Sequence, residues 1–230
     1  LDPAYAPAYV GLAAAYRTYA LSADMPATAV FPKAKAAAEK AVAFDDTLAE
    51  AHAVLGFTIF WYDWDWSASE REYKRALELD PNSADAHWGY AHLLSNMGRH
   101  AEAIVEIKRA IAIEPLNVII NTSEGLYLTD AGQLDEADES LKKAAEIAPD
   151  FWLMHAFAAS LYIEKGMFPE AIAEARKARS LPGVSSMPTA YLAFALAKSG
   201  ARSEAESVLH EMLDRPADQF SPPYHMALIY

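Results

Sequence analysis

The sequence predicts an all-α protein made of a stack of antiparallel helical hairpins. Three observations predict this fold: several columns of residues recur every 34 positions, glycine and proline mark the ends of successive helical stretches, and alanine dominates the apolar residues. A fixed period of this length is typical of repeat architectures, and alanine suits closely packed helices. The recurring glycines are Gly98, Gly132, Gly166 and Gly200.

Each recurring column has a structural role in the predicted hairpin. The glycines follow the first helix, where the chain turns and a positive φ costs little only for glycine. The glutamates fall in the first turn of the second helix, where the helix dipole favours negative charge. The prolines follow the second helix, which they cannot continue. The glutamates are Glu102, Glu136, Glu170 and Glu204; the prolines are Pro81, Pro115 and Pro149, with Gly183 in the place of the next one.

The first helices also carry an apolar residue followed by a small one, as in Leu55-Gly56 and Leu192-Ala193, and a second helix ends in the segment Ala76–Pro81. This pattern resembles the tetratricopeptide repeat. The resemblance covers the whole chain and implies one domain, a right-handed α-α superhelix whose first helices line a concave groove. The predicted repeats are 6–48, 49–83, 84–117, 118–151, 152–185 and 186–216, with a partial seventh at 217–230.

Three departures from the repeat carry predictions. The first unit is about nine residues longer than the period, which predicts an irregular surface loop over Leu21–Pro32. The second unit is one residue too long near 62–64, so its first helix is expected to run further. Residues 221–223 (Ser-Pro-Pro) predict a helix start. The apolar segment after them stops partway along a seventh first helix, so we expect a fragment of a longer array.

The irregular segments narrow the resemblance. The long first unit and the segments 62–66, 119–122 and 221–230 are similar to those in the repeat arrays of bacterial multidomain regulators. In such proteins the array follows a signalling domain such as a nucleotide cyclase, a protein kinase or a winged-helix DNA binder. The resemblance therefore implies a regulatory protein, cytoplasmic in most architectures and extracytoplasmic where a membrane anchor precedes the array.

The composition argues against several classes of function. There are 32 acidic and 19 basic residues, and the net charge of −13 opposes non-specific binding to nucleic acid or to anionic membranes. Without cysteine the chain has no disulfide framework and no thiolate chemistry. No apolar run approaches the roughly 20 residues of a membrane-spanning helix. Because nucleophile elbows, phosphate-binding loops and zinc-binding histidine pairs are also missing from the sequence, we expect no enzyme, cofactor or metal site.

Three features leave alternatives open. His52, His87 and His155 share one repeat position and are expected to pack at the seam between neighbouring hairpins, a metal site being the alternative. Glu124 stands where sister units carry leucine; it is either a paired carboxylate at the hairpin edge or a buried acid that faces the groove and binds a cation. Paired basic residues on the second helices predict a solvated face more than a phosphate site. They are Lys74-Arg75, Lys108-Arg109, Lys142-Lys143 and Arg176-Lys177.

The predicted partner is a protein or peptide held in the groove of the first helices. Aromatic residues there suit an apolar peptide or an amphipathic helix, or they pack between adjacent first helices, and too few cations are present for a carboxylate clamp. We predict an interaction scaffold. The alternatives are a spacer or oligomerisation module, self-associating through the apolar C-terminal end, and an accessory domain of an enzyme such as a nucleotide cyclase. The candidate groove residues are Arg17, Phe57, Phe60, Trp61, Trp88, His92, Asn96, Leu126, Asp130, Phe194 and Lys198.

Overall fold

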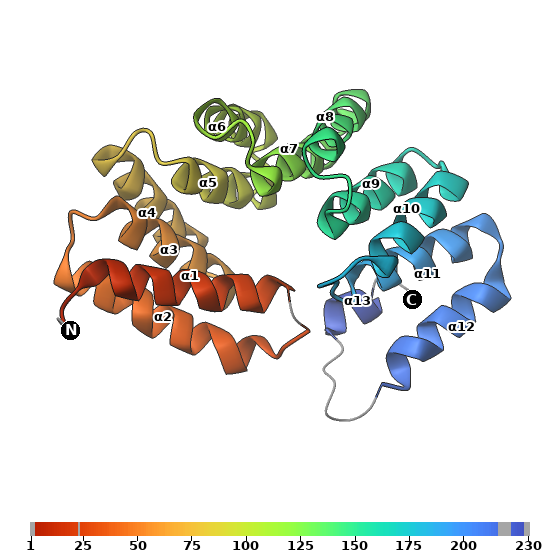
Figure 1. The fold of residues 1–230 in the computed structure, drawn as a ribbon, viewed down its shortest axis with the longest axis horizontal. Helices are drawn as coiled ribbons and strands as arrows, with labels where there is room; N and C mark the ends of the chain where they lie inside the picture. The colour runs from red at the N-terminus through yellow and green to blue at the C-terminus, as the bar shows by residue number, and fades with distance from the viewer. Residues whose placement is uncertain (1–2, 23, 216–221, 228–230) are drawn as a thin grey trace. The chain divides into compact units, whose positions relative to one another are not determined.

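The computed structural model describes residues 3–22, 24–215 and 222–227, and every regular element within these ranges is a helix (Figure 1). This confirms the predicted all-α fold. The described chain forms two compact units. The first unit comprises residues 3–21 and 26–120, and the second comprises residues 22, 24–25, 121–215 and 222–227. That all the repeats form one domain stays a prediction.

The first unit contains three helical hairpins. They pair α1 (Ala6–Ser22) with α2 (Ala27–Phe44), α3 (Ala49–Thr58) with α4 (Trp66–Leu79), and α5 (Ala84–Asn96) with α6 (His100–Ile113). The helix α3 continues directly into a π-helix, η1 (Ile59–Asp63). From α2 to α6, each helix packs against the next along the chain (Figure 1).

The second unit repeats this arrangement. It pairs α7 (Val118–Asp130) with α8 (Leu134–Ile147), α9 (Trp152–Glu164) with α10 (Phe168–Ser180), and α11 (Met187–Ser199) with α12 (Arg202–Leu213). The first residues of α7 still belong to the first unit. From α8 to α12, consecutive helices again pack together, and the short α13 (Pro223–Ala227) contacts α11. Ser221, the predicted cap of this last helix, lies outside the described residues.

The turns are built as the repeat predicts. The four recurring glycines all have positive φ, from 70° at Gly166 to 87° at Gly200. The recurring glutamates stand in the first turns of α6, α8, α10 and α12. The alanine column of the second helices is fully buried, so the helix backbones lie close together. Its members are Ala76, Ala110, Ala144 and Ala178.

The predicted loop over Leu21–Pro32 is wrong at both ends, because α1 runs to Ser22 and α2 begins at Ala27 and contains Pro32. The extra residues of the first repeat lengthen its helices instead: α1 and α2 have 17 and 18 residues, against 14 in α4 and 12 in α12. Proline cannot donate a backbone hydrogen bond. Pro32 lies only five residues after the start of α2, so the bond it lacks is among the first of that helix.

The predicted extension of the first helix in the second repeat is confirmed, and it takes the form of η1. A π-helix accommodates one residue more than an α-helical turn, which absorbs the extra residue. Trp64 then adopts φ 58°, and the side chain of Asp65 caps α4 by accepting a hydrogen bond from the amide of Ala68 at 2.9 Å.

Candidate interaction surface on the first helices

Seven of the eleven predicted groove residues lie on the first helices of the first unit. Arg17 belongs to α1, Phe57 to α3, and Phe60 and Trp61 to η1, which prolongs α3; the others, Trp88, His92 and Asn96, belong to α5. Five of them form what we call the unit-1 aromatic cluster, defined as Phe57, Phe60, Trp61, Trp88 and His92.

The rings of this cluster contact one another across the helices. Trp61 lies edge-on to Phe60, with ring centroids 5.3 Å apart, and stacks on His92 at 5.5 Å. Phe57 contacts Trp61 at 6.0 Å and stacks on Trp88 at 6.3 Å. These are the separations at which aromatic pairs attract. The cluster is therefore continuous from α3 and η1 to α5.

Arg17 covers one edge of the cluster. Its guanidinium carbon lies 5.2 Å from the centroid of Phe57 and 5.3 Å from that of Trp88, within the range of cation–π attraction. Two parallel hydrogen bonds, of 2.9 and 3.0 Å, join the same guanidinium to Asp85. Burial opposes the charge, but the attraction of Asp85 outweighs it and raises the pKa of Arg17. The first and third hairpins are thus joined through this arginine.

The members of the cluster differ in how much surface they offer. Phe57 and Phe60 are buried, at 2% and 7% exposed, and serve as packing beneath the others. Trp61, Trp88 and His92 are half-buried. Burial lowers the pKa of His92 to about 4, so this ring is neutral near pH 7. The buried Nε1–H of Trp61 has no hydrogen-bond partner within the described part of the chain.

The remaining four predicted groove residues belong to α7 and α11. On α7, Leu126 is half-buried and Asp130 exposed. On α11, the ammonium group of Lys198 lies 5.3 Å from the ring centroid of the half-buried Phe194. The structure therefore gathers the aromatic members of the predicted groove on α3, η1 and α5, and leaves one aromatic–cation pair on α11.

Glu124 is a paired carboxylate and not a buried free acid. It is half-buried, and its Oε2 accepts a hydrogen bond of 2.8 Å from the hydroxyl of Ser140 on α8. The first of the two sequence interpretations is therefore confirmed. Within the described ranges no group of three or more histidine, aspartate or glutamate side chains is placed to hold a metal ion.

The three repeated histidines are buried, as expected of packing residues, and each also makes two hydrogen bonds. Each one hydrogen-bonds to a glutamate on the second helix of its own hairpin and to a carbonyl of the turn that precedes it. The expectation of simple packing missed this because the glutamates lie 19 or 20 residues further along the chain. Their shared 34-residue column, Glu106 to Glu174 in two steps, is the feature of the sequence that could have revealed them.

The basic pairs on the second helices form a solvated, ion-paired face, as predicted. Lys74 lies 2.9 Å from Glu70, Arg109 lies 2.7 Å from Glu106, and Lys142 lies 3.1 Å from Asp138. In these three pairs the basic side chain is more than half exposed. These cations are therefore already matched by carboxylates of the same helix.

Two carboxylates on second helices form networks that the sequence did not reveal. Glu70 accepts hydrogen bonds from Tyr90 and Arg99, each at 2.8 Å, in addition to its pair with Lys74. Burial alone would raise the pKa of Glu70, but the bonds from Arg99, Lys74 and Tyr90 outweigh it and lower the pKa to about 2. In the second unit Asp138, two periods later, has equivalent partners: Lys142, Lys165 and Tyr162.

Comparison with known proteins supports the repeat. Residues 65–118 and, separately, residues 121–151 match family descriptions of the tetratricopeptide repeat. No curated protein matches the sequence significantly. None of the helices in the described ranges is both long enough and apolar enough to cross a membrane.

Solved structures show the same fold. The type IV pilus biogenesis factor PilW is 21% identical, with 95% of this chain and 97% of that one covered and a TM-score of 0.72. A thermophilic repeat protein of Thermus thermophilus is 20% identical, with 84% and 99% covered and a TM-score of 0.70. YrrB, a repeat protein described as having an unusual peptide-binding site, is 18% identical, with 81% and 91% covered and a TM-score of 0.52. At these identities the likeness shows the fold alone.

Proposed function

The chain is a tetratricopeptide repeat protein, and from this premise we propose that its first unit binds a peptide segment through the unit-1 aromatic cluster. The observation that carries the proposal is the half-buried layer of Trp61, Trp88 and His92 above the buried Phe57 and Phe60. Large aromatic rings that are held by packing yet partly exposed are the side chains that dominate binding energy at interfaces.

The chemistry of the surface indicates which peptide it would take. The rings favour an apolar or aromatic side chain, and His92, neutral near pH 7, adds no charge to them. Asn96, exposed at the end of α5, adds an amide at the same surface. A peptide segment with an apolar or aromatic anchor meets these requirements.

The context we propose is a bacterial regulatory protein in which this array follows a signalling domain. The resemblance of the irregular segments to such arrays supports it. The full-length chain is expected to carry an effector domain before Leu1, and its sequence is the direct test. An extracytoplasmic location is expected only if a membrane anchor lies upstream.

The binding proposal is tested with a display library of random peptides selected on the purified chain. Peptides enriched on the chain are then titrated against Trp88→Ala and Trp61→Ala by calorimetry. We expect each substitution to weaken binding by about tenfold or more, since truncation of an interface anchor costs about 2 kcal/mol.

The matched control is Trp64→Ala. Trp64 is 74% exposed but lies in the turn after η1, outside the cluster. Selected peptides should bind this variant as they bind the unaltered chain. Peptides whose affinity falls with Trp64→Ala and not with Trp88→Ala would contradict the proposed surface, and so would a library that yields no peptide dependent on Trp61 or Trp88.

A further inference from the structure

The same histidine–glutamate arrangement occurs in three hairpins, which we call the His–Glu pairs. The Nδ1 atoms lie 2.7 Å from Glu72 for His52, 2.5 Å from Glu106 for His87, and 2.6 Å from Glu174 for His155. The Nε2 atoms lie 3.0, 3.0 and 2.8 Å from the carbonyl oxygens of Asp46, Pro81 and Pro149 respectively. Each imidazole therefore joins the two helices of a hairpin and also the turn before it.

The hydrogen bonds at these sites require a proton that a neutral imidazole beside an ionised glutamate would not have. A backbone carbonyl can only accept, so Nε2 must carry a hydrogen. An ionised glutamate can also only accept, so Nδ1 must carry a hydrogen as well. Both bonds form when the imidazole is protonated. Once that proton leaves, a nitrogen lone pair faces a carboxylate at 2.5 to 2.7 Å, and one of the two bonds is lost.

The surroundings of His87 show how the charge is held. Glu106 on α6 faces its Nδ1, and Arg109, also on α6, pairs with the other oxygen of the same carboxylate. From the turn, only the neutral carbonyl of Pro81 bonds to it in the described structure. Burial and the charge of Arg109 lower the pKa of His87, but the hydrogen bonds to Glu106 and Pro81 and the negative charge of Glu106 outweigh them and raise it.

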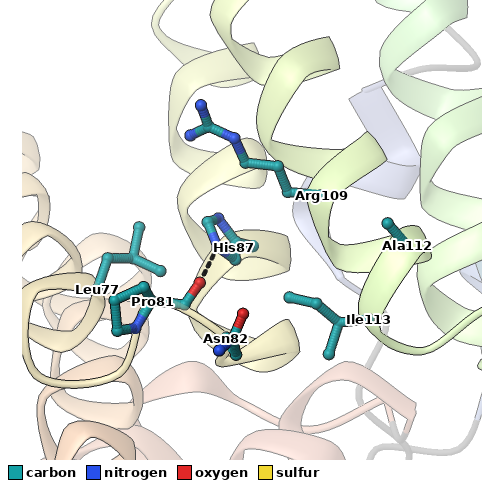
Figure 2. A pocket seen from close by; sticks show the side chains of 7 residues that line it. All are labelled: Leu77, Pro81, Asn82, His87, Arg109, Ala112 and Ile113. Carbon is teal, nitrogen blue, oxygen red and sulfur yellow. Dashed lines mark hydrogen bonds between the residues drawn. The ribbon is translucent and has the colours of Figure 1, made fainter.

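His87 is buried, at 5% exposed. It borders a surface pocket of about 410 Å³. Figure 2 shows Leu77 and Pro81 on one side of this pocket, Ala112 and Ile113 on the other, and the bond from His87 to the Pro81 carbonyl between them.

Two hairpins carry neutral residues in place of the pair. One period after His87 and Glu106, the chain has Asn121 and Ser140; one period after His155 and Glu174, it has Thr189 and Val208. Both replacement sets are accommodated in α-helical hairpins, with helices of 12 to 14 residues. The fold therefore does not require the histidine and the glutamate at these positions.

We propose that the His–Glu pairs make the array sensitive to pH, so that its hairpins and the turns before α3, α5 and α9 are held firmly when the pairs are protonated and loosen when they are not. The raised pKa of His87 means that the stabilising contribution of its pair is fully present below about pH 6.5 and is lost as the pH rises through the higher folded value. Mild alkalinity therefore acts on the α5–α6 hairpin and leaves the hairpins with neutral residues at these positions unchanged.

The test replaces each pair by the residues of the α11–α12 hairpin, as in His87→Thr with Glu106→Val, first singly and then in all three hairpins together. Urea unfolding is followed between about pH 6 and pH 9. The urea concentration at the midpoint of unfolding should fall across this range for the unaltered chain, and it should fall clearly less for the triple-pair variant. His210→Gln, which removes an exposed histidine outside the pairs, should keep the full dependence.

A second measurement does not depend on the variants folding. Nitrogen NMR of the histidine rings in the unaltered chain should show His87 with hydrogens on both nitrogens at about pH 6. One hydrogen should be lost at a pH above the pKa of an unperturbed histidine side chain. The amide of Ser83, in the turn before α5, should lose exchange protection over the same interval. A neutral His87 ring at pH 6, or a triple-pair variant with the same pH dependence as the unaltered chain, overturns the proposal.

Discussion

The two units share one repeat but fill it with different side chains. In the first unit the core contains Phe31, Phe57, Tyr73 and Tyr90. In the second unit the core around α11 is built from alanine with Leu192, Leu196 and Val208. The second helices of both units nevertheless carry the same alanine column and the same kind of carboxylate network, at Glu70 and Asp138.

The difference teaches that the repeat columns set the backbone while the positions between them set the surface. The residues on α3, η1 and α5 include several half-buried aromatic rings. On α11 the corresponding feature is the single pair of Phe194 and Lys198. Four of the five tryptophans, Trp61, Trp64, Trp66 and Trp88, lie in the first unit. Tryptophan fluorescence therefore reports chiefly on that unit, while circular dichroism reports on both.

The largest effect is expected from Gly89→Ala in the first unit. A Cβ at this position would lie 2.6 Å from the ring of Tyr73, which is 2% exposed and packed on both sides. Overpacking of this kind costs about 1 to 3 kcal/mol. Fluorescence-detected urea unfolding should show the loss. Gly11→Ala is the matched control, because nothing lies within 4 Å of its Cβ and it should instead gain up to about 1 kcal/mol.

The next effect concerns the carboxylate networks. Glu70→Gln should cost about 1 to 2 kcal/mol at pH 7, since hydrogen bonds to a charged group are lost. The depressed pKa of Glu70 means that this stabilisation is present above about pH 4.5 and is lost as the pH falls toward about 2. The stability gap between the two proteins should therefore close over that interval.

Asp138→Asn extends this comparison to the second unit. Burial opposes ionisation there too, but the hydrogen bond from Lys142 and the charges of Lys142 and Lys165 lower the pKa of Asp138. Asp138→Asn should also lower the free energy of unfolding at pH 7, and this difference from the unaltered chain should also disappear in acid. Circular dichroism should detect the change better than fluorescence does. A stability gap for either variant that persists unchanged at pH 2 would contradict the role assigned to its network.

A smaller effect is expected from Arg17→Ala. It removes the pair with Asp85 and the cation–π contacts with Phe57 and Trp88, together worth about 1 kcal/mol. Lys198→Ala in the second unit removes a single contact of an exposed cation and should cost less. Equal losses for the two substitutions would show that Arg17 adds nothing beyond an ordinary surface contact.

The sequence alone determined the repeat. A glycine that must take positive φ, a proline that cannot continue a helix and an alanine that must be buried are local or periodic requirements, and all three could be read from the 34-residue columns. The extension of α3 by η1 was also predictable, because the second repeat has one extra residue that must be accommodated. The helical course of α2 through Pro32 was not predicted. Proline cannot donate a backbone hydrogen bond, and only the structure shows that Pro32 lies near the start of a helix.

Only the tertiary structure decided which side chains meet. The sequence placed Arg17, Phe57 and Trp88 on first helices, but their contact with one another and with Asp85, 68 residues from Arg17, depends on how three hairpins stack. It also identified the repeated histidines, whose glutamate partners lie on the opposing helix. The period of a repeat fixes backbone position, whereas the protonation, burial and pairing of a side chain depend on neighbours brought close by packing.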